Sequence, residues 1–287
     1  MKITKLLAAL AVAFSVNALA SDTVKIMHTG GKSGTTSVIA NEYANEFKKH
    51  FAKVETIGPG GCIPVLNTLK SEKDPVLVLW DSGLLPTDEC RPEFVKNPPV
   101  ATFGVYFMLC TSAENNFTLS DFKRGNSRVA LSTPFAFWDR WYRDIAAKTG
   151  AAYTSVPVGD SGKLVLSLIS KETDWAMING QRAYAQMQDK KLRCVASTNP
   201  AGEAGLPFIG NSIAGFDRGE LILGFSAYVA NAKTADREKI ESVLINLHKS
   251  EQFQTFLKNS KFIDHTVSAP AVKKNFNDNM IRIMSDK

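Results

Sequence analysis

The sequence lacks a second long apolar run, a block of like charge and an internal repeat. After the first twenty residues the longest apolar stretch covers residues 100–110, which is too short for a membrane-spanning helix and is typical of a buried strand. Lysine and arginine number 34 against 28 acidic residues, but this excess is spread along the chain. The pattern therefore predicts a globular protein with no nucleic-acid partner.

Motifs for catalysis and metal binding are also missing. The four histidines are scattered, and neither G-x-S-x-G nor HExxH occurs. Residues 30–36 (GGKSGTT) look superficially like a phosphate loop but fail its G-x-x-x-x-G-K-[ST] spacing. No His, Asp or Glu cluster has metal-ligand spacing. We therefore expect a non-enzymatic protein without a metal or cofactor, with an exported enzyme as the rival class.

Residues 1–20 have the pattern of a secretory signal peptide. Lys2 and Lys5 form a positive start, residues 6–16 are apolar, and residues 18–20 (ALA) give a small-x-small cleavage site. A retained membrane anchor is the weaker alternative, because the apolar run is too short to span a bilayer. The pattern predicts an exported mature chain, residues 21–287.

Strand-like and helix-like patterns alternate along the mature chain, which predicts an α/β fold with mostly parallel sheets flanked by helices. Two such series are joined by crossings near Leu109 and Leu223. This arrangement predicts two lobes, residues 21–108 plus 223–287 and residues 109–222, with a ligand cleft between them. A single doubly wound sheet is the alternative.

Four turns combine glycine, serine or threonine with the start of a predicted helix: residues 31–36, 59–62, 132–135 and 160–163. A helix N-terminus offers unpaired N–H groups and a positive dipole end, so such turns can hold an anion. Each of them could equally be an ordinary cap or tight turn. Lys32 could face the ligand or solvent, and Asp160 is expected to cap the helix that follows it.

The four cysteines match no zinc pattern, and export makes a disulfide plausible. Cys110 and Cys194 lie in apolar, strand-like runs and are expected to be core thiols. Cys62 and Cys90 lie in turn-like contexts, so a Cys62–Cys90 bridge is predicted, although pairing cannot be deduced from sequence.

Seven motifs follow one another along the mature chain: Gly30-Gly31 with Ala40, residues 57–63 (IGPGGCI), 73–82 (KDPVLVLWDS), 156–162 (VPVGDSG), 174–178 (DWAMI), 203–207 (EAGLP) and 224–230 (GFSAYVA). In this order they resemble the Bug family, the periplasmic substrate-binding proteins of tripartite tricarboxylate transporters. The chain departs from the family where an Asp and an Arg are usual in the first loop, since Ser37 and Asn41 stand there. The Pro-rich stretch before Glu203 is also shortened.

The resemblance implies a two-lobed periplasmic-binding-protein fold of type II, in which a small carboxylate is caught between the lobes. It further implies a periplasmic monomer that delivers this ligand to integral membrane transporter subunits. A receptor for another uptake system or a sensor kinase could use the same fold. The predicted ligand-binding residues are Gly31, Lys32, Ser33, Thr35, Thr36, Pro59, Gly60, Gly61, Asp81, Ser82, Ser132, Thr133, Phe135, Asp160, Ser161 and Asn179.

Overall fold

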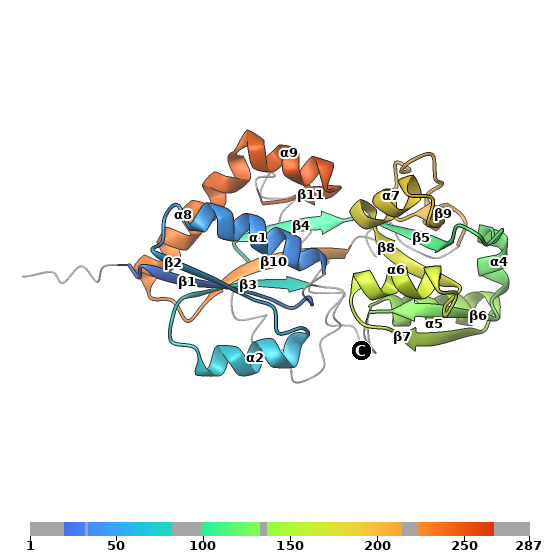
Figure 1. The fold of residues 1–287 in the computed structure, drawn as a ribbon, viewed down its shortest axis with the longest axis horizontal. Helices are drawn as coiled ribbons and strands as arrows, with labels where there is room; N and C mark the ends of the chain where they lie inside the picture. Colours follow the sequence, from blue (N-terminus) through green and yellow to red (C-terminus); the bar gives the residue numbers. More distant parts are fainter. Residues whose placement is uncertain (1–19, 32–33, 82–98, 133–136, 214–222, 267–287) are drawn as a thin grey trace, which may run out of the picture.

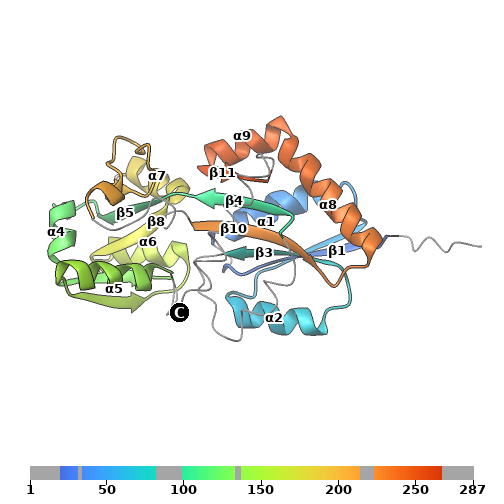
Figure 2. The same ribbon diagram turned by 180° about the vertical axis from the view of Figure 1, so that it is seen from behind.

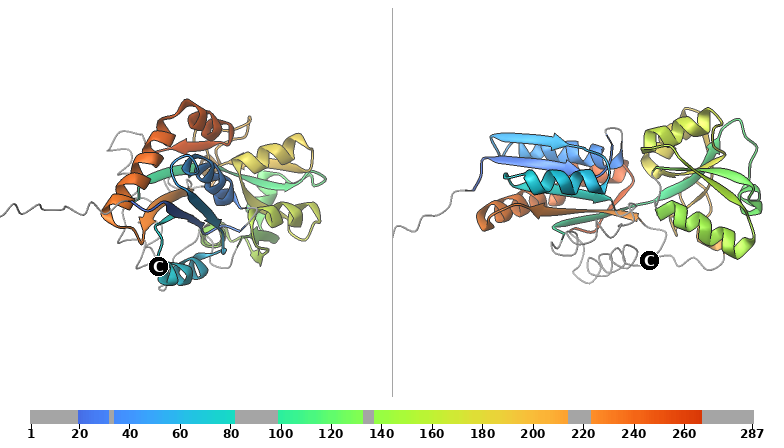
Figure 3. Two further views of the ribbon diagram at one scale, coloured as in Figure 1. Left: turned by 60° about the vertical axis from the view of Figure 1, so that its left-hand side comes forward. Right: turned by 90° about the horizontal axis from the view of Figure 1, so that it is seen from below.

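The computed structural model describes residues 20–31, 34–81, 99–132, 137–213 and 223–266. Helices and strands alternate through these residues, and the strands form two separate sheets, one in each of two lobes (Figure 1). The lobes lie side by side along the long axis of the molecule (Figure 3, right). The predicted two-lobed α/β fold is confirmed, and the alternative of a single sheet is wrong.

The sheet of the first lobe has the strand order β11-β4-β10-β3-β1-β2. Strands β1, β2 and β3 pair in parallel, whereas β10 runs antiparallel to both of its neighbours and β11 is antiparallel to β4. The described elements of this lobe are β1 (Thr23–His28), α1 (Thr35–Phe47), β2 (Lys53–Ile57), α2 (Cys62–Ser71), β3 (Val76–Asp81), β4 (Ala101–Val105), β10 (Leu223–Ala230), α8 (Thr234–Lys249), α9 (Glu251–Asn259) and β11 (Phe262–Asp264).

Successive apolar side chains along the strands point to opposite faces, so both faces of this sheet are apolar. Ile26 and Leu77 belong to a buried cluster with α1, α8 and α9, whereas the neighbouring Met27 and Val78 pack with α2 on the opposite face. Figures 1 and 2 show these helices covering the two faces. Because side chains in a strand point to alternate faces, a continuous apolar strand needs cover on both sides.

The sheet of the second lobe has the order β7-β6-β8-β5-β9. Strands β7, β6 and β8 pair in parallel, and β5 is antiparallel to β8 and β9. The clusters on its two faces involve α4 and α5 on one side and α6 and α7 on the other. The described elements are β5 (Phe107–Ser112), α4 (Leu119–Arg124), β6 (Ser127–Leu131), α5 (Phe137–Thr149), β7 (Tyr153–Pro157), α6 (Ser161–Ile169), β8 (Trp175–Asn179), α7 (Gly180–Gln188), β9 (Leu192–Ser197) and a short 3-10 helix η1 (Ile209–Asn211).

Both sheets are mixed rather than mostly parallel as expected. The antiparallel pairs involve β4, β10 and β11 in the first sheet and β5 in the second. The apolar run at residues 100–110 is not one strand. It breaks at Tyr106, where the chain leaves the first sheet after β4 and enters the second as β5. The predicted lobe boundaries at 108/109 and 222/223 stay predictions; the change of sheet falls at Tyr106.

The expectation that Cys110 and Cys194 are separate core thiols is wrong. They lie opposite each other on β5 and β9, and their sulfur atoms form a disulfide with an S–S distance of 2.00 Å. The adjacency of these strands follows from the strand order, which the sequence does not display. The predicted partner of Cys62, Cys90, lies outside the described residues, so that pairing stays a prediction.

We expect the double variant Cys110→Ala with Cys194→Ala to lower the free energy of unfolding by about 2–4 kcal/mol, because the bridge closes a loop across a sequence separation of 84. Urea denaturation of the mature chain measures this change. Cys110→Ala alone should lower stability as much as the double variant does. A midpoint identical to that of the unaltered protein would contradict the prediction.

Among the described helices, none combines the length and the apolar character that crossing a bilayer requires. The predicted signal peptide lies outside the described residues except for Ala20.

Candidate ligand-binding cleft

A cavity of about 350 Å³ lies between the lobes. Its lining comes from both sheets, at the turns that follow the carboxyl ends of parallel strands: Thr29 and Gly31 after β1, Gly60 after β2, Ser132 after β6 and Gly159 after β7. Ligands of open α/β sheets bind at this edge. The volume is at the lower end of the range for small-molecule pockets.

The first lobe presents two helix starts to this cavity. Helix α1 begins after Gly34 and α2 after Gly61, and neither capping glycine has a side chain that could bond the first N–H groups. Gly60 and Gly61 have φ values of 73° and 77°, which glycine adopts without strain. These helix starts therefore turn N–H donors and positive dipole ends toward the cavity.

The second lobe contributes the starts of α6 and α7. Asp160 caps α6 and accepts from the backbone N–H groups of Gly162 at 2.8 Å and Lys163 at 3.2 Å, so the prediction that it caps this helix is confirmed. Asn179 caps α7 by accepting from the N–H of Arg182 at 3.0 Å. The amide of Asn179 also donates to the hydroxyl of Thr35, which joins the two lobes.

Two hydroxyls at these helix starts have no hydrogen-bond partner among the described residues. They are Thr36 Oγ1, on a side chain that is 1% exposed, and Ser161 Oγ. A Cβ built at Gly30 would lie 2.1 Å from Thr36 Oγ1, so only glycine leaves room for this hydroxyl. A buried polar group without a partner costs about 1–3 kcal/mol, which a bound acceptor would recover.

The charged side chains among the described lining residues are acidic, Asp81 and Asp160. In this part of the lining, positive potential therefore comes from helix N-termini. Each terminus carries roughly half an elementary charge. The described residues also contain no group of three His, Cys, Asp or Glu side chains suited to a metal ion.

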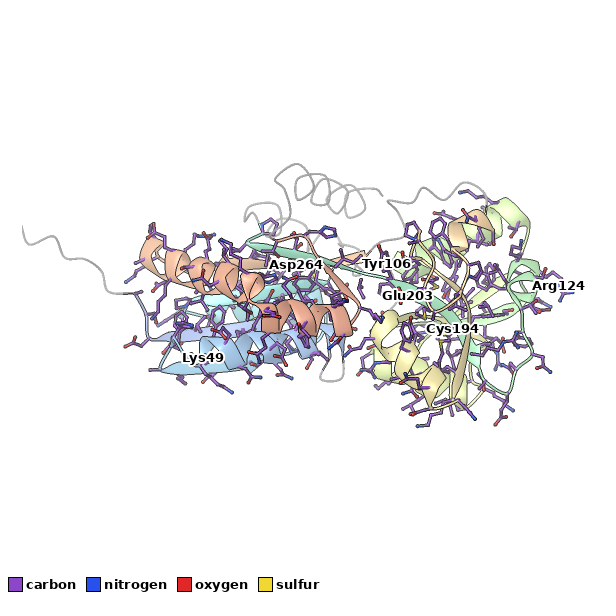
Figure 4. All side chains as sticks on the ribbon, turned by 90° about the horizontal axis from the view of Figure 1, so that it is seen from above. Lys49, Tyr106, Arg124, Cys194, Glu203 and Asp264 are labelled. Atoms are coloured by element: carbon purple, nitrogen blue, oxygen red, sulfur yellow. A yellow bond between two sulfur atoms is a disulfide. The ribbon has the colours of Figure 1, made fainter. Side chains whose placement is uncertain are left out.

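A second contact between the lobes lies near Tyr106, at the change of sheet (Figure 4). Lys261 Nζ lies 3.6 Å from Glu203 Oε1 and 4.6 Å from the centre of the Tyr184 ring. Burial raises the pKa of Glu203, but hydrogen bonds from Tyr184 and Asn199 outweigh it and the pKa is lowered, so Glu203 stays ionised. An ion pair this exposed contributes at most about 1 kcal/mol. This ion pair therefore adds little to the free energy that holds the lobes together.

Most of the predicted ligand residues that the structure describes meet in this cavity. Those that line it are Gly31, Thr35, Thr36, Gly60, Gly61, Asp81, Ser132, Asp160, Ser161 and Asn179. Pro59 is described but is not part of the lining. Lys32, Ser33, Ser82, Thr133 and Phe135 lie outside the described residues.

Several lining residues were not predicted, and they fall into two groups. The first group belongs to the same turns and could have been found from them: Thr29, Gly30, Gly34 and Gly159. The second group is apolar: Phe107, Trp138, Leu164, Met177 and Phe225, of which Phe225 could, from the sequence, either line the cleft or pack in a buried strand. In the sequence these five cannot be told from core residues, because each belongs to an ordinary buried strand or helix pattern.

No protein-family model and no curated protein sequence matches the chain. Solved structures do match. The periplasmic binding protein BugD shares 14% identity at a TM-score of 0.73, with 91% of this chain and 95% of that one covered. R. palustris Rpa4515 with adipate shares 15% identity at a TM-score of 0.73, with 91% of this chain and 94% of that one covered. MatC from Rhodopseudomonas palustris with bound malate shares 15% identity at a TM-score of 0.67, with 91% of this chain and 97% of that one covered. The chain thus has the fold of these periplasmic binding proteins.

Proposed function

We propose that the mature protein is a periplasmic solute-binding protein of the Bug family that captures a small carboxylate between its lobes. This proposal rests on two buried hydroxyls at helix starts that line one cavity. Thr36 Oγ1 from the first lobe and Ser161 Oγ from the second have no hydrogen-bond partner among the described residues. A carboxylate accepts from hydroxyl and backbone N–H donors and is stabilised by the dipoles.

Binding rather than catalysis is supported by the donor set. The described lining offers helix N-termini and hydroxyls, and it contains no histidine that could activate one of these hydroxyls as a nucleophile. The seven sequence motifs and the shared fold favour delivery of the ligand to membrane subunits of a tripartite transporter. The N-terminal pattern of residues 1–20 favours a periplasmic location, and a monomer suffices because both lobes belong to one chain.

The lobes are proposed to close on the ligand. The described polar contacts between them include Asn179 with Thr35 and Lys261 with Glu203, and a ligand that bridges both lobes would add to these contacts and favour closure.

Thermal unfolding and small-angle scattering of the mature chain test this proposal. A ligand at a hundredfold excess over Kd adds about 2.7 kcal/mol. This raises the melting temperature by roughly 5–10 °C in a chain of this size. Succinate, citrate, glutamate and benzoate are the probes, and succinamide and benzamide are the uncharged controls.

We expect at least one carboxylate to raise the melting temperature, to shrink the radius of gyration and to be recovered unchanged. An equal effect of an amide and its acid would contradict anion binding. Stabilisation without compaction would contradict closure of the lobes.

A further inference from the structure

The cavity has an apolar wall that capture of a carboxylate group alone does not explain. Phe107, Trp138, Met177 and Phe225 line it, and the last three are at most 6% exposed. Phe107 packs against the buried clusters of both lobes, one of which contains Phe225 and the other Trp138 and Met177. These side chains therefore form an apolar surface that runs across the junction of the lobes.

The geometry of this wall suits a flat apolar group. The rings of Phe107 and Trp138 meet edge to face, with centres 4.9 Å apart and an interplanar angle of 65°. Aromatic rings prefer such tilted or offset contacts with one another, and each buries a large apolar area. Phe107 lies opposite Asn179 in the β5–β8 register. The wall therefore adjoins a helix start that belongs to the polar side of the cavity.

A second carboxylate would find a poor environment in the described lining. The charged side chains among the described lining residues are Asp81 and Asp160, so this part of the lining has no cationic side chain to pair with a second carboxylate. A buried charge needs a partner of opposite charge or a full set of donors. The described donors, which are hydroxyls and helix starts, lie on the polar side of the cavity, whereas the aromatic wall offers only the indole N–H of Trp138.

We propose that the ligand is an aromatic monocarboxylate, whose carboxylate lies at the starts of α1 and α6 and whose ring lies against Phe107, Trp138, Met177 and Phe225. This inference rests on the proposed function and narrows it to one substrate class. Aliphatic di- and tricarboxylates are then poor ligands, because their second charge would face the apolar wall.

Titration calorimetry of the mature chain with matched acids tests the substrate class. Benzoate and terephthalate share one ring and differ by a carboxylate, and benzamide removes the charge. Malate, adipate and citrate represent aliphatic acids with several carboxylates. We expect benzoate to bind at least about tenfold more tightly than each of the other five compounds.

The outcomes separate the two proposals. Tighter binding of terephthalate, malate, adipate or citrate would overturn the aromatic monocarboxylate while leaving carboxylate capture intact. If no acid binds more tightly than benzamide, both the inference and the proposed function fail.

A pair of variants tests the wall itself. Phe107→Leu removes the ring from the cavity and should weaken the binding of benzoate about tenfold. The affinity for acetate, which has no ring, should change less than twofold. Phe122→Leu is the matched control, because Phe122 is a buried aromatic residue of the same lobe that does not line the cavity. It should leave the ratio of the two affinities unchanged. Equal losses for benzoate and acetate in Phe107→Leu would overturn the role of the wall.

Discussion

Replacing Thr36 with valine should weaken carboxylate binding about 10- to 100-fold while leaving the ligand-free protein as stable as before, or slightly more stable. Thr36 Oγ1 is buried and has no partner among the described residues. A hydrogen bond to a charged group contributes about 1.5–3 kcal/mol, and each 1.4 kcal/mol is a factor of ten in affinity. Without ligand, a methyl group in place of an unpartnered hydroxyl removes a desolvation cost.

The opposite signs of these two effects distinguish a ligand-binding hydroxyl from a structural one. Thr102 provides the matched control, because its Oγ1 is also buried without a partner among the described residues but lies on β4, outside the lining. Thr102→Val should keep the affinity unchanged. Titration calorimetry and thermal unfolding of both variants provide the two readouts. A less stable Thr36→Val protein with unaltered affinity would show that the hydroxyl supports the fold instead.

Ser161→Ala extends this test to the other lobe. If one carboxylate bridges both hydroxyls, the losses in Thr36→Val and Ser161→Ala are coupled, and the double variant departs from their sum by more than about 0.5 kcal/mol. Strict additivity would indicate that the two hydroxyls contact separate parts of the ligand.

The polar half of the candidate site could be predicted because its signals are local. Glycine before a helix, as at Gly60 and Gly61, and an aspartate with serine, as at Asp160 and Ser161, are read directly from neighbouring residues. The carboxyl ends of parallel strands then bring such turns together without further information. The cavity accordingly gathers turns that lie more than one hundred residues apart.

The apolar half could not be predicted, since its signals are tertiary. Met177 lies in a strand in which every residue is buried, and nothing in the sequence marks it as facing a cavity rather than a helix. The same limit explains the misread cysteines. Cys110 and Cys194 meet only because β5 and β9 are neighbours, and that neighbourhood is a property of the strand order.

Strand boundaries show a third limit. Residues 103–110 contain no charged, amide, serine or threonine side chain, so no such residue marks the break at Tyr106 where the chain changes sheets. The break occurs because β4 and β5 belong to different sheets, and one straight strand cannot pair in both. Hydrophobic periodicity alone does not contain this information.

The largest effect on stability is expected at a buried polar network in the first lobe, whose residues do not line the cleft. His248 is fully buried and joins three elements: its Nδ1 lies 2.9 Å from Asp264 Oδ2, and its Nε2 lies 2.7 Å from the hydroxyl of Tyr43. The Asp264 carboxylate accepts, so Nδ1 carries the proton that is donated. Gln254 and the backbone of Thr266 also donate to Asp264.

Asp264→Ala should lower the free energy of unfolding by about 3–5 kcal/mol, because it leaves the buried His248 ring without its acceptor. The melting temperature would then fall by roughly 10 °C. Asp189 is the control, since its ion pair with Lys191 is 3.4 Å long and both side chains are 54% exposed. Asp189→Ala should change stability by less than about 1 kcal/mol. Carboxylate affinity at low temperature should be unchanged in both variants.

The same network predicts a dependence of stability on pH. Burial raises the pKa of Asp264, but the hydrogen bond and the charge of His248 outweigh it, so the pKa of the folded protein lies below its ordinary value. Because the carboxyl pKa is lower in the folded than in the unfolded state, ionised Asp264 stabilises the folded protein. This stabilisation is fully present above the pKa of the unfolded chain, which is about 4. This stability is lost as the pH falls through the folded value. Asp264→Asn keeps the shape but cannot ionise, so urea denaturation between about pH 2 and 5 should show a flatter decline in stability than in the unaltered protein. Parallel curves for the two proteins would mean that the ionisation of Asp264 does not stabilise the fold.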